Sequence, residues 1–112
     1  MLVWFLTRVE VIAALARRAR ENSLTPTELH KSKEQLALLE QGWSEVIATE
    51  RVRDRAYRLL DNRPLRAADS LQLAAALLAS EDNPQGLGFV TFDQRLGAAA
   101  EKEGFTVLGG YV

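Results

Sequence analysis

The sequence predicts an α/β fold with a mainly parallel sheet. Short apolar runs alternate with longer amphipathic stretches along the chain, which is the pattern of βα units. The 112 residues leave no room for two independent cores, and the 47% apolar and 26% charged content matches ordinary globular usage. We therefore expect a single domain over residues 1–112.

The N-terminal part is predicted to form a strand followed by a helix. The apolar run at 2–6 suits a short buried strand, and Thr7 is expected to cap a helix that reaches about residue 22. Apolar residues recur along that helix as one stripe. The stripe consists of Val9, Ile12, Ala13, Ala16 and Ala19.

The middle of the chain is predicted to form two helices around a second strand. Thr25-Pro26-Thr27-Glu28 is a capping box with proline at the first helical position, and it opens a helix to about residue 41. A strand is expected at 44–48, and Thr49 is expected to cap a third helix that closes before Pro64. The apolar side of the third helix carries Val52, Ala56, Leu59 and Leu60.

A fourth helix is predicted over 65–80. Its sequence is apolar nearly all round, which predicts a helix buried between layers. Asp93 is expected to cap the last helix, which Gly104 stops. The remaining elements are expected as a turn at 83–86, a strand at 88–92, a helix at 94–103 and a strand at 105–108.

Composition excludes several kinds of chemistry. With no cysteine the chain has no disulfide, thiolate metal site or cysteine nucleophile, and its single histidine, His30, excludes a multi-histidine zinc site. A formal net charge of −1 gives no sign of nucleic-acid binding by charge alone. Neither a membrane span nor a signal peptide is recognisable, so a cytoplasmic protein is expected. Catalysis would have to use carboxylates, hydroxyls and cations.

Three acidic residues occupy places where a parallel α/β topology brings ligands together. Glu10 lies in the first turns of the first helix, Asp69 in the opening turns of the apolar helix, and Asp93 directly after an apolar strand. Each also has a purely structural interpretation, as a charge that complements a helix dipole or as a helix cap. A cluster of carboxylates without His or Cys suits Mg²⁺ or Mn²⁺, which can activate water against a phosphodiester. This combination is typical of a nuclease.

Three segments that contain these acids resemble a known family. They are Thr7-Arg8-Val9-Glu10-Val11, the run from Leu65-Arg66-Ala67-Ala68-Asp69 to Ala74, and Val90-Thr91-Phe92-Asp93-Gln94-Arg95-Leu96. They look like PIN domains of the VapC toxin kind, and the similarity runs from residue 1 to about 108. The resemblance implies a three-layer domain in which helices flank the central sheet. It also implies a metal-dependent endoribonuclease of a toxin–antitoxin system, with Glu10, Asp69 and Asp93 holding Mg²⁺ or Mn²⁺ and Thr91 at most supporting a ligand.

The resemblance also implies that a part of the family pattern is missing. Such domains open with a central strand that carries a first aspartate, whereas only nine residues, none of them acidic, precede Glu10. We therefore expect the first central strand to be absent and the activity to be impaired. The implied partners are an RNA substrate, an antitoxin protein of the VapB kind and a second copy in a homodimer, with no membrane.

Two other hypotheses remain beside the enzyme. A catalytically inactive PIN-like remnant would bind protein or RNA through its arginine faces, and the missing aspartate favours it, whereas the three remaining acids favour the enzyme. A receiver-like signalling domain would need a lysine on a later strand, but the only lysine after residue 33 is Lys102, on the final helix. The arginine faces consist of Arg17, Arg18 and Arg20, and of Arg51, Arg53, Arg55 and Arg58.

Overall fold

Five helices and four short strands make up residues 1–109, the part of the chain that the computed structural model describes. The predicted mixed α/β class is confirmed, and the chain divides into two compact units. Unit 1 is Met1–Val46, and unit 2 begins at Ile47. A single domain over 1–112 stays a prediction, and its last three residues lie outside the described part.

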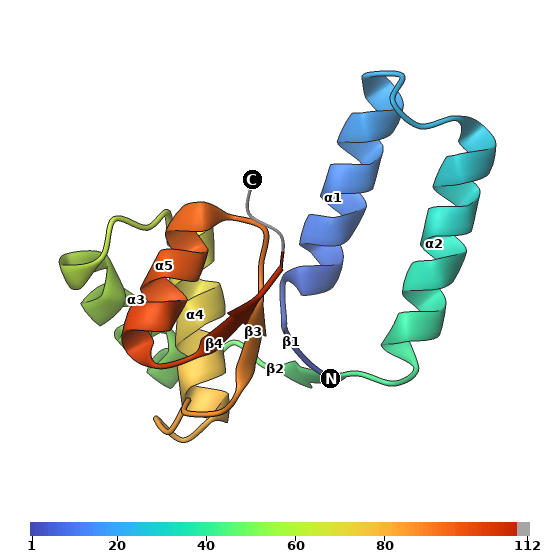
Figure 1. Ribbon diagram of the computed structural model, residues 1–112. Coiled ribbons are helices and arrows are strands. Elements are labelled where there is room, and N and C mark those ends of the chain that lie inside the picture. The colour runs from blue at the N-terminus through green and yellow to red at the C-terminus, as the bar shows by residue number, and fades with distance from the viewer. Residues whose placement is uncertain (110–112) are drawn as a thin grey trace. The chain divides into compact units, whose positions relative to one another are not determined.

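Unit 1 is a helical hairpin that starts and ends in a strand (Figure 1). Strand β1 (Leu2–Trp4) leads into α1 (Thr7–Arg20), and α2 (Pro26–Glu40) leads into β2 (Ser44–Val46). The two strands pair in parallel, and the hairpin is fastened where α1 begins and α2 ends. There, Arg8 Nε donates a hydrogen bond of 2.6 Å to Glu40 Oε1.

The start of α1 differs from the predicted cap. Leu6 occupies the capping position, and Thr7 is already the first helical residue. Its hydroxyl therefore accepts a hydrogen bond from the backbone N of Trp4, 3.0 Å away, and bends the chain back toward β1. The prediction of Thr7 as a helix cap is wrong, because the hydroxyl serves the strand that precedes the helix.

The start of α2 confirms the predicted capping box. Thr25 Oγ1 accepts from the backbone N of Glu28 at 3.1 Å, and Glu28 Oε1 accepts from the backbone N of Thr25 at 2.9 Å. These hydrogen bonds stabilise the charged carboxylate, so they hold the pKa of Glu28 below its ordinary value.

Unit 2 contains α3 (Glu50–Asn62), α4 (Ala67–Ala79), β3 (Gly88–Val90), α5 (Gln94–Glu103) and β4 (Thr106–Leu108). Strands β3 and β4 pair in parallel, with Phe89 opposite Val107. Both strands are shorter than predicted, and Phe92, expected inside the first of them, is exposed. The predicted caps are confirmed: Thr49 accepts from the backbone N of Val52 at 3.3 Å, and Gly104 ends α5 in a left-handed conformation.

The core of unit 2 is built around α4, which packs against α3. Leu73 is fully buried, as predicted for a helix between layers, whereas Leu60 of α3 is exposed. The rings of Phe89 and Phe105 lie 5.5 Å apart and join the β3–β4 pair to this core. The buried apolar residues of unit 2 are Val52, Ala56, Leu59, Leu73, Ala74, Ala75, Leu77, Phe89, Leu96, Ala99, Ala100 and Phe105.

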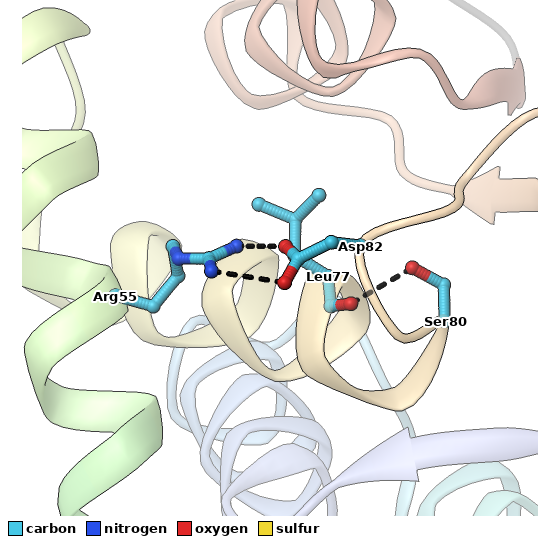
Figure 2. Close-up of polar contacts among 4 residues, drawn as sticks. All are labelled: Arg55, Leu77, Ser80 and Asp82. Atoms are coloured by element: carbon cyan, nitrogen blue, oxygen red, sulfur yellow. Dashed lines mark hydrogen bonds and ion pairs between the residues drawn. The ribbon is translucent and has the colours of Figure 1, made fainter.

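Two arginine–carboxylate pairs hold α3 in unit 2. Arg55 reaches from α3 to Asp82, which follows α4, and both ends of the guanidinium donate to the carboxylate (Figure 2). Arg63, at the end of α3, donates to Glu103 Oε2 from both Nε and Nη2, at 3.2 and 2.6 Å. Paired donors of this kind fix geometry as well as charge.

The strands of the described residues form two separate parallel pairs, β1 with β2 and β3 with β4. The parallel pairing is as predicted; one pair lies in unit 1 and the other in unit 2, and a single central sheet stays a prediction. No helix of the described part is long and apolar enough to cross a membrane.

Candidate active site

Asp69 lies in the first turn of α4, at the edge of the apolar core. The helix begins after Arg66, whose extended backbone marks the capping position but whose side chain makes no capping hydrogen bond. Asp69 is therefore the acid nearest the free backbone N–H groups of this helix. Its neighbour Ser70 is buried and donates a 2.7 Å hydrogen bond to the carbonyl of Ala67. This local bonding fixes the turn that carries Asp69.

Asp93 is placed by the end of β3 and the start of α5. Thr91 continues the pairing of the strand, because its backbone N donates to the carbonyl of Leu108 at 3.0 Å. The buried Thr91 hydroxyl then accepts from the backbone N of Asp93 at 3.1 Å. Asp93 caps α5 as predicted, since its Oδ1 accepts from the backbone N of Leu96 at 2.9 Å. The Thr91 hydroxyl thus fixes the backbone of Asp93 through this hydrogen bond.

The electrostatics of unit 2 connect these two aspartates. Partial burial raises the pKa of Asp69, and the negative charge of Asp93 raises it further, while Arg66 opposes both effects. The two carboxylates therefore lie close enough to repel each other. A partly buried carboxylate beside a second one is destabilised in its charged form unless a cation compensates the charge.

Glu10, the third predicted site residue, belongs to unit 1. It is exposed on the first turn of α1, and its backbone N donates to the carbonyl of Leu6 at 2.9 Å. Over residues 1–109, no three histidine or acidic side chains form a group that could hold a metal ion. Within unit 2, Asp69 and Asp93 lie within electrostatic range of each other.

The donor set of this pair fits a hard divalent cation. Two carboxylates supply oxygen ligands and compensating charge, and Mg²⁺ or Mn²⁺ commonly binds through one or two carboxylates and keeps its remaining positions for water or substrate phosphate. The cap bond of Asp93 uses one of the two carboxylate oxygens, so capping and ligation are compatible. Residues 69 and 93 therefore satisfy the minimum requirement of such a site.

One functional group of this site was not singled out from the sequence. Arg66 puts a positive charge next to Asp69, three residues before it. The signal was available, because an i,i+3 spacing places two side chains on the same side of a helix. An exposed guanidinium near Asp69 can bind a phosphate group or compensate part of the negative charge of Asp69.

No family model, curated protein or solved structure gives a significant match to this chain. The resemblance to PIN domains is therefore carried by the three sequence segments alone.

Proposed function

We propose that the protein is a metal-dependent endoribonuclease of the PIN and VapC toxin kind. A single observation carries the proposal: half-buried Asp69 lies within the electrostatic range of Asp93, in the two sequence contexts that resemble the family. A divalent cation would relieve the repulsion between these two carboxylates. The PIN-like layered arrangement, the antitoxin and the homodimer belong to the same proposal.

The residues of the chain have distinct tasks in this proposal. Asp69 and Asp93 would hold Mg²⁺ or Mn²⁺, which when bound would lower the pKa of a water molecule and stabilise charge on a phosphodiester. Thr91 keeps Asp93 oriented through its hydrogen bond to the backbone N of that residue. Arg66 attracts the phosphate group toward the two acids.

The test compares three isosteric substitutions in the purified chain. Asp69→Asn and Asp93→Asn remove one ligand charge each, and asparagine keeps the capping hydrogen bond at position 93. Glu101→Gln, at an exposed position near the end of α5, is the control. We expect each site variant to lower Mn²⁺-dependent cleavage of a panel of structured RNAs at least about 100-fold, since changing even the outer-shell partners of metal ligands costs about 10–100-fold. Glu101→Gln should cleave like the unmodified chain.

Calorimetric titration with Mn²⁺ separates the two remaining hypotheses. The nuclease requires binding that Asp69→Asn abolishes and that weakens at lower pH, because protons compete for a carboxylate whose pKa is raised. A folded chain that neither binds Mn²⁺ nor cleaves RNA would be the inactive remnant. Cleavage that persists unchanged in both site variants would refute the assignment of the two aspartates.

Glu10 is tested separately, because it lies in unit 1. Glu10→Gln keeps the shape of the side chain and removes its charge. A loss of cleavage comparable to that of Asp69→Asn would give Glu10 the role that the family resemblance implies. Unchanged cleavage would leave the reaction to Asp69 and Asp93.

A further inference from the structure

Three of the four arginines of α3 lie on one side of the helix. Arg51, Arg55 and Arg58 recur at i, i+4 and i+7, a spacing that puts their side chains on one face. Arg53 lies about 200° around the helix from Arg51, on a different face. We call the set Arg51, Arg55 and Arg58 the arginine surface.

Asp82 lies beside the arginine surface. It forms the paired hydrogen bonds with Arg55 (Figure 2), and it also lies within the electrostatic range of Arg51 and Arg58. The hydrogen bonds from Arg55, and after them the charges of the three arginines, hold the pKa of Asp82 below its ordinary value. Asp82 is fixed by the end of α4, where its backbone N donates to the carbonyl of Leu77 at 2.9 Å.

The charge of the arginine surface is only partly compensated. Arg51 and Arg58 are exposed, and within residues 1–109 neither forms an ion pair, while Asp82 is engaged by Arg55. The guanidinium groups of Arg51 and Arg58 therefore remain available for an anionic group from outside the chain.

We infer that the arginine surface binds the phosphate backbone of single-stranded RNA. Guanidinium groups match phosphate oxygens in geometry and remain charged at all physiological pH values. The surface and Asp69 lie at opposite ends of α4, because Asp82 follows the helix and Asp69 begins it. Thirteen helical residues separate two such ends by roughly 20 Å, so an RNA strand of several nucleotides would reach both. The choice of RNA rests on the proposed nuclease function.

The experiment measures RNA binding without cleavage. A fluorescein-labelled 20-nucleotide uridine oligomer is titrated with the chain in EDTA, and the dissociation constant is followed by anisotropy from 25 to 200 mM salt. Arg51→Ala and Arg58→Ala should each weaken binding and lower the slope of log Kd against log salt by about 0.7, the value for one single-strand phosphate contact. Arg53→Ala, the same change on another face of the same helix, should leave the slope unaltered.

A fourth variant tests whether removing a negative charge from the arginine surface strengthens RNA binding. Asp82→Asn removes the carboxylate that pairs with Arg55, so it should tighten RNA binding if phosphate occupies the surface. Equal effects of Arg53→Ala and Arg58→Ala, or no RNA binding by the folded chain, would overturn the inference. So would equally tight binding of polyglutamate with the same number of charges, because that result would point to an acidic protein partner.

The outcomes for the two proposals are separable. Binding in EDTA does not require the metal site, so a chain that binds through Arg51 and Arg58 but never cleaves would refute only the nuclease. A chain that cleaves through Asp69 but responds equally to the substitutions at positions 53 and 58 would refute only the arginine surface. Thermal melts of each variant confirm that the fold is retained.

Discussion

Units 1 and 2 contain similar secondary-structure elements and differ in the number of residues that these elements bury. Each contains a parallel pair of three-residue strands and at least one helix that begins at a threonine or aspartate cap. Yet α1 has no buried residue and α2 has one, Leu36, whereas α4 alone has five. Regular helices thus form in unit 1 from local signals, and the stability of unit 2 comes chiefly from its core.

The largest expected difference concerns one leucine in each unit. Leu73→Ala empties a fully buried position in α4 and should lower the free energy of unfolding by about 2–5 kcal/mol. Leu38→Ala, in α2, changes a side chain that is 66% exposed and should cost less than about 0.5 kcal/mol. Urea denaturation monitored by circular dichroism measures both. Equal losses of unfolding free energy in the two variants would mean that the Leu38 side chain is shielded from water in solution.

The second comparison concerns one arginine–carboxylate pair in each unit. Arg63 and Glu103 are both mostly shielded from water, whereas Arg8 in the pair with Glu40 is largely exposed. A double-mutant cycle to alanine should give a coupling of about 1–2 kcal/mol for the first pair and about 0.3 kcal/mol for the second. Raising the salt concentration should weaken the exposed pair more. The reverse order would contradict the difference in burial.

The third comparison uses carboxylates whose pKa values are shifted in opposite directions. Hydrogen bonds lower the pKa of Glu28 in unit 1, so its contribution to stability is present above its unfolded pKa and is lost as the pH falls. Burial and the charge of Asp93 raise the pKa of Asp69 in unit 2, so folding is favoured at low pH and weakened as the pH rises through the folded value.

Carboxyl NMR titration measures both pKa values directly, with Glu28 titrating below and Asp69 above the unfolded reference. Asp69→Asn should also raise the free energy of unfolding at neutral pH, because it removes the repelled charge. A destabilised Asp69→Asn variant would show that the carboxylate has a favourable partner within the chain and would weaken the case for a cation site at Asp69.

The sequence predicted the local features of this fold better than its long-range ones. The caps at Thr25, Thr49 and Asp93 follow from hydrogen bonds within four residues, so their side chains and spacing suffice to identify them. The prediction that Thr7 caps α1 was wrong because a threonine hydroxyl at a strand–helix junction can accept a hydrogen bond from either element. Here it accepts from the backbone N of Trp4 in the strand. The hydrophobic periodicity of the sequence could not determine which strands pair with each other, since strand pairing depends on residues far apart in the chain.

For the candidate site, too, the sequence predicted the local features better than the long-range ones. Asp69 and Asp93 each lie at the start of a helix, which sequence signals place correctly, and both belong to unit 2. Glu10 is also where its helix was expected, but no local signal determines which distant acids it meets. The role of Asp82 was missed for this reason as well, because its partner Arg55 is 27 residues away.

The smallest expected effect concerns the turns that end α1 and α4. Both have the hydrogen bonds of a Schellman motif, from Asn22 and Ser23 in unit 1 and from Glu81 and Asp82 in unit 2. Asn22 and Glu81 occupy the left-handed position, with φ values of 59° and 54°. Asparagine tolerates that conformation better than glutamate, whose Cβ and longer side chain are strained there.

Glu81→Gly should therefore stabilise the protein by up to about 1 kcal/mol, because glycine adopts this conformation without a steric penalty. Asn22→Gly should change the free energy of unfolding by only a few tenths of a kcal/mol, since the strain that it relieves is smaller. Thermal melts of the two variants against the unmodified chain measure the difference. A larger gain at position 22 would show that the turn of unit 1 stores more strain than its asparagine indicates, and a loss at position 81 would show that the Glu81 side chain contributes to holding the turn before Asp82.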